Sequence, residues 1–412
     1  MLQKKDTILK IGSHFMFKKS KTKPKLPSEA KCCGCSACYA SCPAKAISMV
    51  ADKEGFLQPH IDKKLCIGCG KCENACPVLH QNPSRKPIEV FASRAKDEET
   101  LVGSSSGGIF TLLAKKTIAN GGVVFGAAWE YPSCKVRHIA ATTYTDLDML
   151  RGSKYLQSEM GNIFQEVKLA LQSNREVLFS GCPCQIAGLK KYLGDDNANL
   201  LTVDIICHGA PSPLAWNAFL KQRENESGEK VSKVISRRYC SWVNFKLSLQ
   251  FQSPEKIYSK SYPENSFLVG FLQNYFLRKC CHQCSFRKLR SGSDITIGDA
   301  WGFEKQIPDF NDDKGISTTI INTTKGKNAF SQILDDIQKY DISFEETCNS
   351  NPTLLGNYKK TWRRKKFFTL IKKMDFDSVI SKLNSSGFFR KCHLLLWWLK
   401  RLIINREVNK LW

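Results

Sequence analysis

The sequence predicts an α+β protein with a small cysteine-rich N-terminal domain, a larger domain built on a mixed, partly parallel sheet, and a basic helical C-terminal tail. Three observations lead to this prediction. Cysteines recur with one spacing in two blocks between residues 32 and 77. Strand-like apolar segments alternate with segments of helical periodicity from residue 88 to residue 345, which is typical of sheets with helical crossovers. Lysine and arginine gather at both ends of the chain.

The first block of cysteines defines a metal-binding domain. Residues 32–43 and 66–77 each follow C-x2-C-x2-C-x3-C and end in proline. This is the spacing of a two-cluster bacterial-type ferredoxin, in which the fourth cysteine of each quartet ligates the other cluster. We therefore predict two 4Fe-4S clusters. Their ligands are Cys32, Cys35, Cys38 and Cys76 for the first cluster, and Cys42, Cys66, Cys69 and Cys72 for the second.

Disulfides and zinc are the alternatives for these cysteines. Zinc sites usually need only two C-x2-C pairs or a mixture with histidine, so two matched quartets closed by proline argue against zinc. The start of the chain is too interrupted by lysine for a signal peptide, and no apolar run reaches the length of a membrane span. We therefore expect a cytoplasmic protein with reduced, metal-ligating cysteines. Cys33 breaks the spacing and is interpreted as a bystander.

The charge is unevenly distributed. Of a net charge of +24, residues 1–31 contribute nine lysines and two acids, and residues 359–412 contribute fifteen Lys/Arg and three acids. So basic a balance can indicate nucleic-acid binding. Here the region between the two ends carries little net charge, which argues against a nucleic-acid partner. The first 30 residues are expected to be a disordered basic arm.

Within the first domain, residues 46–61 read as strand, turn and strand. Residues 80–87 have the composition of a linker. The larger domain then reads as a strand, a helix from Ile109, a strand, a helix and two strand–loop–helix units, over residues 88–95, 109–118, 121–129, 162–172, 174–194 and 199–222. This order predicts parallel strands with right-handed crossovers. Antiparallel strands are expected in 231–262, and a strand, a Lys-Gly-Lys turn and a helix in 315–338.

Two features of this larger domain suggest ligand sites. The loops after the strands of the two strand–loop–helix units carry Cys182, Cys184 and Cys207, and ligands bind at the carboxyl ends of strands in such sheets. A small-residue loop precedes the helix that begins at Ile109, and a helix start suits a phosphate or flavin pyrophosphate. That loop matches no established phosphate motif, so a plain helix cap is an equal alternative. Its candidate residues are Ser105, Ser106, Gly107 and Gly108.

Six stretches of the larger domain resemble, in order, the coenzyme F(420) hydrogenase/dehydrogenase beta-subunit family: SSSGGIFTLLAKK, RGSKYLQS, VLFSGCPCQIAGLKKYL, VDIICHGAPSP, CCHQCSF and SDITIGDAWG. The resemblance covers roughly residues 30–370. It is closest to bacterial members with a fused N-terminal ferredoxin, which often accompany polysaccharide genes. It implies that the C-terminal module binds FAD and one further 4Fe-4S cluster. It also implies that electrons pass between clusters, flavin and a substrate, which is the deazaflavin coenzyme in archaeal members.

A third cluster needs four thiolates brought together by the fold. The resemblance and the loop positions favour Cys184, Cys207, Cys281 and Cys284. Cys182 and Cys280 are the neighbouring alternatives, and free buried cysteines are the plain structural alternative.

Other polar residues in the resembling stretches are candidates with structural alternatives of similar weight. His208 and Lys154 are candidate catalytic groups for positioning substrate or donating a proton. Lys154 and Tyr155 are candidate flavin contacts, and Asp294 and Asp299 are candidates for holding a ribityl hydroxyl.

The predicted tail is basic and amphipathic in two segments, 361–373 and 387–404. Peripheral contact with the inner face of a membrane is one interpretation, and docking onto the protein's own core or a partner is the other. The expected regions are therefore a basic arm, a two-cluster ferredoxin domain, a flavin and iron–sulfur domain, and a basic tail: 1–30, 31–80, 88–345 and 350–412.

The leading functional prediction is an iron–sulfur flavoprotein oxidoreductase. Its partners would be reduced ferredoxin or another redox protein and a small-molecule acceptor, which is the deazaflavin coenzyme or a sugar- or lipid-linked substrate. The alternative is a non-catalytic electron-transfer subunit of a larger complex.

Overall fold

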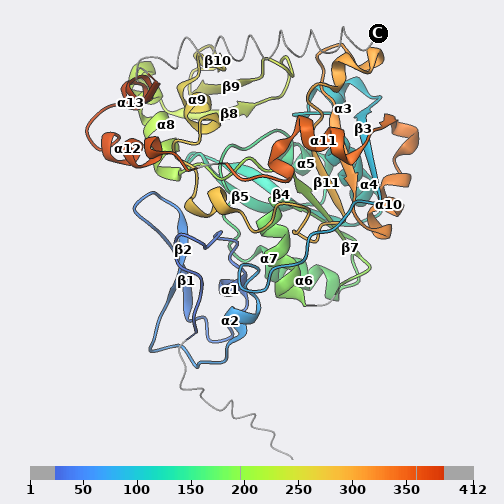
Figure 1. Cartoon of the computed structure of the whole chain (residues 1–412), viewed down its shortest axis with the longest axis horizontal. Coiled ribbons are helices and arrows are strands. Elements are labelled where there is room, and N and C mark those ends of the chain that lie inside the picture. Colours follow the sequence, from blue (N-terminus) through green and yellow to red (C-terminus); the bar gives the residue numbers. More distant parts are fainter. Residues whose placement is uncertain (1–23, 195, 359, 385–412) are drawn as a thin grey trace, which may run out of the picture.

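The computed structural model describes residues 24–194, 196–358 and 360–384, and Figure 1 shows the course of the chain. It confirms the predicted fold class, because a large mixed sheet is combined with helices and with a small cysteine-rich domain. Most of the predicted basic arm and the segment 387–404 lie outside the described residues. No helix in the described ranges combines the length and the apolar character that crossing a bilayer requires.

The N-terminal domain consists of one hairpin and two short helices. The hairpin pairs β1 (Ile47–Ala51) with β2 (Leu57–Ile61) in antiparallel register, which confirms the predicted strand, turn and strand. The helices are α1 (Ala37–Ala40) and α2 (Lys71–Asn74), each within one cysteine quartet. The Asp52 carboxylate accepts the N–H groups of Glu54 and Phe56, which fixes the turn of the hairpin.

The larger domain is organised around an eight-stranded sheet in the order β13-β3-β12-β11-β7-β6-β4-β5. The four inner strands β11, β7, β6 and β4 are parallel, and the strands on either side are antiparallel. This arrangement confirms the mixed, partly parallel sheet. The strands are β3 (Glu89–Ala95), β4 (Val123–Glu130), β5 (Lys135–Ala141), β6 (Val177–Gly181), β7 (Leu200–Ile205), β11 (Ile295–Asp299), β12 (Ser317–Ile321) and β13 (Ile337–Asp341).

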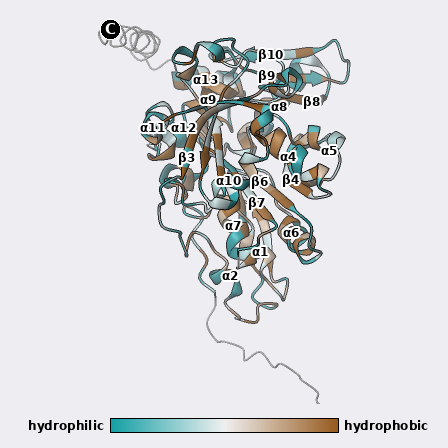
Figure 2. Ribbon diagram, turned by 90° about the vertical axis from the view of Figure 1, so that its right-hand side faces the viewer, coloured by the Kyte–Doolittle hydropathy of each residue, from teal (hydrophilic) through white to brown (hydrophobic). Residues whose placement is uncertain are grey.

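Helices cover both faces of this sheet. One apolar core joins α4 (Ile109–Ala119), α5 (Tyr144–Leu150) and α10 (Thr324–Ser331) to the strands. A second core joins α6 (Ile163–Gln172) and α7 (Pro183–Leu193) to the strands and also contains residues of the cysteine-rich domain. The central strands are the most hydrophobic part of Figure 2. Shorter helices are α3 (Glu98–Val102) and α11 (Phe344–Ser350).

The predicted Lys-Gly-Lys turn is wrong, because residues 325–327 lie inside α10. The Thr323 side chain caps this helix by accepting the Gly326 N–H. A methyl group at Gly326 would lie 2.4 Å from the Asp294 carbonyl oxygen, so the glycine permits close packing of the helix on the sheet.

A third core lies at one end of the molecule (Figure 1) and is rich in aromatic side chains. It joins a three-stranded sheet, which confirms the predicted antiparallel strands, to four helices: β8 (Val231–Ser236), β9 (Lys246–Phe251), β10 (Ile257–Ser261), α8 (Pro213–Ser227), α9 (Ser266–Leu272), α12 (Trp362–Leu370) and α13 (Phe376–Asn384). Phe367, Phe376 and Leu383 are fully or almost fully buried here. The described part of the expected tail is therefore an integral part of the folded body.

Candidate functional site

The second predicted cluster set surrounds a small cavity in the N-terminal domain. Cys42, Cys66, Cys69 and Cys72 line it, together with apolar residues of the hairpin such as Ile47. Burial raises the pKa of Cys72 to about 11, and the Glu73 and Cys42 charges add to the shift. The arrangement brings the fourth cysteine of the first quartet to the first three of the second, which fits the crossed ligation of a two-cluster ferredoxin.

The first predicted cluster set is more deeply enclosed. Burial, followed by the neighbouring thiolates of Cys32 and Cys76, raises the pKa of the Cys38 thiol. Cys35 is buried and lies near Cys38. Thiols that resist ionisation in this way become stable thiolates when metal replaces the proton. Among the described residues, no three His, Cys, Asp or Glu side chains are spaced to hold a single metal ion.

A larger cavity lies between the two domains, and seven cysteines line it. Four are the favoured ligands of a third cluster, two are their neighbours, and one is the predicted bystander of the first quartet: Cys184, Cys207, Cys281, Cys284, Cys182, Cys280 and Cys33. Among the described residues of the lining, four side chains are cationic and Asp204 is the single carboxylate; the cations are Lys31, Arg278, Arg287 and Lys288. A basic lining of this kind favours an anionic occupant.

The fold explains why these cysteines meet. Cys182 and Cys184 follow the carboxyl end of β6, and Cys207 follows the neighbouring parallel strand β7. The other cavity cysteines of the larger domain are Cys280 and Cys281, in the 3-10 helix η1 (Lys279–Gln283), and Cys284, which follows it. Parallel strands bring their carboxyl ends to one edge, as the sequence predicted.

Hydrogen bonds between thiols distinguish the members of this group. A hydrogen bond from Cys280 lowers the pKa of Cys281 to about 7, and the Ala210 N–H also donates to Cys281 Sγ at 3.3 Å. The thiol of Cys182 is hydrogen-bonded to Cys207, and that of Cys184 to Cys33. Because the thiolate is the form that binds metal, the lowered pKa of Cys281 favours ligation, and the pKa of Cys33 is also lowered by hydrogen bonds from Cys184 and Cys35.

Cys33 lies where the two domains meet. Its thiol is hydrogen-bonded to Cys184 and to Cys35, so it touches both the central cavity and the first cysteine set. Its carbonyl oxygen accepts a hydrogen bond from Gln157 Nε2 at 2.8 Å. The broken spacing of Cys33 gave no hint of this position.

His208 lines the central cavity but is held by its neighbours. Its Nε2 lies 2.9 Å from Asn274 Oδ1, and its ring packs against Tyr358 with centroids 4.2 Å apart. Burial lowers the pKa of His208 to about 4. The imidazole is therefore neutral near pH 7.

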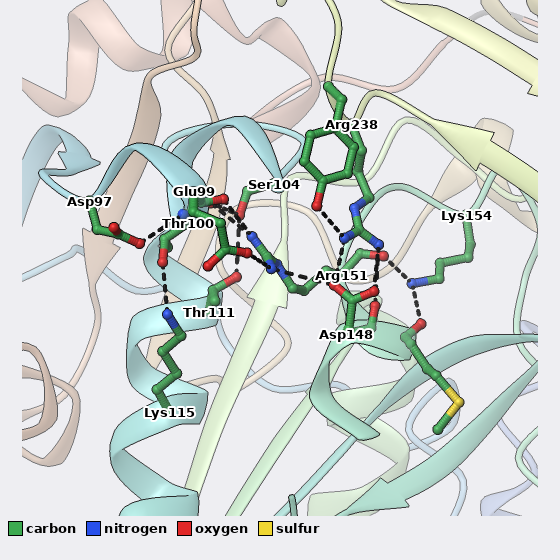
Figure 3. A network of polar contacts seen from close by, with 12 residues as sticks. Asp97, Glu99, Thr100, Ser104, Thr111, Lys115, Asp148, Arg151, Lys154 and Arg238 are labelled. Atoms are coloured by element: carbon green, nitrogen blue, oxygen red, sulfur yellow. Dashed lines mark hydrogen bonds and ion pairs between the residues drawn. The ribbon is translucent and has the colours of Figure 1, made fainter. Parts of the chain in front are cut away.

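A polar network joins the small-residue loop to the RGSK segment (Figure 3). At its centre Arg151 contacts the carboxylates of Glu99 and Asp148, and Asp148 also pairs with Arg238. Lys154 is different, because among the described residues its Nζ donates only to two carbonyl oxygens, those of Met149 and Arg151, at 3.0 and 2.7 Å. Burial lowers the pKa of Lys154 to about 7.

The small-residue loop lies close to this network, and its glycines have a packing role. The hydroxyls of Ser105 and Ser153 are 3.0 Å apart, and Ser106 donates to the Ile316 carbonyl. A methyl group at Gly107 would lie 2.2 Å from the Ser93 carbonyl oxygen. Gly108 has a left-handed φ of 81° and precedes α4. The close backbone approach at Gly107 is therefore to the protein's own strands, and Gly108 permits the left-handed turn that leads into α4.

The two candidate aspartates lie at opposite ends of β11. Asp299, at the carboxyl end, forms a two-pronged ion pair with Arg237 at 2.6 and 2.9 Å and accepts the Trp242 indole N–H. Arg237 is also hydrogen-bonded to Tyr155, whose pKa burial raises to about 12. Asp294 precedes the strand, and its carboxylate accepts hydrogen bonds from the N–H and hydroxyl of Thr202 and from the hydroxyl of Thr323. Asp294 therefore lies apart from the other candidates.

Comparison with known proteins finds a similar family for a segment in each of the two domains. Residues 31–79 match the family described as 4Fe-4S dicluster domain, and residues 174–343 match the C-terminal region of the beta subunit of coenzyme F(420) hydrogenase/dehydrogenase. Among solved structures, a chain of the F(420)-reducing nickel–iron hydrogenase complex from Methanosarcina barkeri, solved as a xenon derivative, is 18% identical. That match covers 73% of this chain and 93% of the other, with a TM-score of 0.46. No curated protein matches.

Proposed function

Since residues 174–343 of this chain belong to the coenzyme F(420) hydrogenase/dehydrogenase beta-subunit family and residues 31–79 are a 4Fe-4S dicluster domain, we propose that this iron–sulfur electron-transfer protein is a flavin-dependent oxidoreductase. The observation that carries the proposal is the cavity of seven cysteines, which adjoins both the first cluster set and the body of the larger domain. The cavity offers a place for a redox centre beyond the two clusters of the dicluster domain, as an electron path into the larger domain requires.

We assign a third 4Fe-4S cluster to this cavity, with Cys184, Cys207, Cys281 and Cys284 as ligands. The lowered pKa of Cys281 and the cationic lining support an anionic, thiolate-bound group. Clusters of this type supply one-electron transfer when bound, at potentials set by their surroundings. Cys182, Cys280 and Cys33 then surround the ligands as neighbouring thiols.

We assign FAD to the polar network around the RGSK segment. Among the described residues, no carboxylate lies within ion-pair distance of Lys154 Nζ, so the amine, when protonated, is available to donate a hydrogen bond to the flavin. Ser105, Ser106, Tyr155 and Asp299 are the other candidate contacts. A bound flavin supplies two-electron as well as one-electron chemistry. Gly107 and Gly108 shape the loop, and Asp294 is left out of the site.

We propose that Lys154 is the acid–base group of this site. A pKa of about 7 allows its amine to hold or release a proton near neutral pH. His208, with a pKa of about 4, is a neutral hydrogen-bonding group beside the cysteines. We therefore assign His208 the positioning role and Lys154 the acid–base role.

The electron donor that fits this assignment is reduced ferredoxin or another small redox protein. The acceptor is a small molecule, for which the deazaflavin coenzyme and a sugar- or lipid-linked compound are the candidates. We place the reaction in the cytoplasm, where the thiols stay reduced.

Iron and flavin analysis tests the proposal. After anaerobic reconstitution, we expect about 12 Fe per chain, from three cubanes of four irons each, and one FAD. The double variant Cys281→Ser/Cys284→Ser is expected to keep about 8 Fe, because only the third cluster loses ligands. Cys134→Ser is the matched control, since Cys134 is buried in the aromatic core away from the cavity.

Two outcomes contradict parts of this proposal. A wild-type chain with about 8 Fe would remove the third cluster. A chain with full iron that neither retains nor binds FAD would favour the alternative, a non-catalytic electron-transfer subunit. If FAD binds, reduction of candidate acceptors by dithionite-reduced ferredoxin identifies the substrate class.

A further inference from the structure

Arg278 is a buried cation that connects the two domains. It precedes η1 in the larger domain, and its side chain reaches into the cysteine-rich domain. Its Nε donates to the Cys32 carbonyl at 2.9 Å, and its Nη2 donates to the Leu57 carbonyl at 2.7 Å. Its Nη1 donates to Gln157 Oε1 at 3.1 Å. Gln157 in turn bonds the Cys33 carbonyl, so one guanidinium and one amide hold the start of the first cysteine quartet.

The fit around the guanidinium is close. A methyl group on Gly34, which lies between Cys33 and Cys35, would come within 2.5 Å of Arg278 Nη1. The planar group also lies over the Phe56 ring, 5.2 Å from its centroid. Arg278 is only 2% exposed to solvent. Its position is therefore determined by contacts on all sides.

Within the described ranges, no carboxylate balances this charge. The three hydrogen-bond acceptors of Arg278 are uncharged, and none of the described Asp or Glu side chains pairs with it. Other buried arginines in this protein are paired, as Arg223 is with Asp377 and Arg364 with Glu54. A buried unpaired cation is strongly unfavourable in a protein interior. The groups near Arg278 that can become anionic are the thiols of Cys32 and Cys33 in the N-terminal domain and of Cys280 and Cys281 in η1.

We infer that Arg278 is a positioning residue for electron transfer. It holds the first cysteine quartet against the η1 cysteines. Its fixed positive charge also raises the reduction potential of the cluster bound by Cys32, Cys35, Cys38 and Cys76. Reduction adds one negative charge to a cluster, and a nearby cation stabilises that added charge. The neighbouring thiolates of Cys280, Cys32 and Cys33 offset the effect of burial and raise the pKa of Arg278, which agrees with this electrostatic coupling. The same charge faces the central cavity.

The contacts require arginine and not only a positive charge. Three different acceptors in three directions match the fork of a guanidinium, and a lysine ammonium on a flexible stem reproduces the charge but not this geometry. The two roles can therefore be separated by substitution. Arg278→Lys keeps the positive charge but weakens the hydrogen-bonded contact between the domains, whereas Arg278→Met removes the charge and the hydrogen bonds.

The test is an EPR-monitored redox titration of the full chain, with iron content measured first. Arg278→Met is expected to lower the reduction equilibrium constant of the first cluster about tenfold, which is about 59 mV for a one-electron couple. Arg278→Lys is expected to stay close to the wild-type potential. The control is Arg223→Met/Asp377→Asn, which removes a buried arginine of the aromatic core together with its carboxylate partner. It should leave the potential unchanged.

Two results overturn the inference. One is an iron-replete Arg278→Met protein whose reduction potentials equal those of the wild type. The other is an equal shift of the first cluster's reduction potential in the Met and Lys variants, which would attribute the effect to the lost hydrogen bonds. Arg278→Gln serves as a second neutral variant. If both neutral variants lose first-cluster iron and the Lys variant keeps it, the charge is required for assembly; if all three lose it, the electrostatic role fails.

Only the statement about the central cavity rests on the proposed function. The first cluster belongs to the dicluster domain, so a wild-type iron content of about 8 would remove the third cluster and leave the test on Arg278 intact.

Discussion

His138 shows how a single buried side chain can make this protein sensitive to acid. It lies on β5 and is 4% exposed. Its Nε2 must donate to the Ser180 carbonyl, 2.8 Å away, because a carbonyl only accepts. Its Nδ1 therefore accepts from the Ser158 hydroxyl at 2.7 Å, and Ser158 Oγ accepts from Gln185. Burial lowers the pKa of His138 to about 4.

This shift predicts a loss of stability in mild acid. Between pH 6.5 and pH 4 the unfolded chain binds a proton on this histidine and the folded chain does not, so the free energy of unfolding falls as the pH falls. The loss attributable to His138 should be roughly 2 kcal/mol between pH 7 and pH 5. We expect His138→Gln to lack this component when both proteins, with equal iron content, are unfolded by denaturant at the two pH values. If the wild type and His138→Gln lose the same free energy of unfolding between the two pH values, His138 is not the group responsible.

Sequence reasoning succeeds at the residue scale where chemistry is local. The eight ferredoxin cysteines could be predicted because each quartet lies within about a dozen residues and its spacing follows cluster geometry. Arg278 and Gln157 could not, because their partners lie more than 100 residues away, in Cys32 and Cys33. The contacts of Cys33 with Cys184 and Gln157 could not be predicted for the same reason.

At the scale of one element, α7 positions both the central cavity and the first cysteine set. Pro183 begins the helix directly after Cys182, and Cys184 lies in its first turn. One turn further on, Gly188 packs against Cys35, where a methyl group would lie 2.9 Å from Sγ. The helix therefore approaches the cysteine-rich domain closely only because Gly188 has no side chain.

We predict that Gly188→Ala impairs the first cluster. Alanine favours a helix by about 1 kcal/mol over glycine, so the helix itself should not suffer. The added methyl group instead displaces Cys35, and we expect a reduced or altered EPR signal from the first cluster and a loss of up to about 4 Fe. Lys191→Ala, on the same helix, is the control. A normal signal and full iron in Gly188→Ala would show that α7 or the cysteine loop can shift without harm.

The order of helices and strands could be predicted where hydrophobic periodicity and loop composition agreed. What an amphipathic helix packs against could not be predicted from its own sequence. The alternation of strands and helices placed Cys182 and Cys207 at neighbouring strand ends. The amphipathic basic segment 361–373 contains the whole of α12, and periodicity alone left open whether its apolar face met a membrane, a partner or the protein itself. The burial of Phe367 and of Arg364 against the body decides for the protein's own core.

At the scale of the whole molecule, the hairpin of the cysteine-rich domain docks onto the larger domain through its turn. The Glu54 carboxylate pairs with Arg364 of α12, which is itself bonded to the Leu277 carbonyl at 2.7 Å. The Glu54 carbonyl accepts from Ser212 Oγ at 2.5 Å. This contact, together with Arg278, fixes the first cluster set relative to the central cavity, although the linker 80–87 is largely exposed.

Removing the Glu54 carboxylate should loosen this docking. Glu54→Ala leaves Arg364 buried without a counterion, and breaking a buried pair in this way costs about 3–5 kcal/mol. If the domains separate more often, the linker opens to trypsin at Arg85, while Pro87 protects the bond after Lys86, and cleavage accelerates about tenfold for every 1.4 kcal/mol lost. The double variant Glu54→Ala/Arg364→Met should recover part of the resistance, because no unpaired charge remains. Glu255→Ala, at an exposed position in the turn between β9 and β10, controls for the loss of one carboxylate. Equal cleavage rates in Glu54→Ala and in this control would mean that the domains are held together without the Glu54 contact, by Arg278 and the apolar packing around α7.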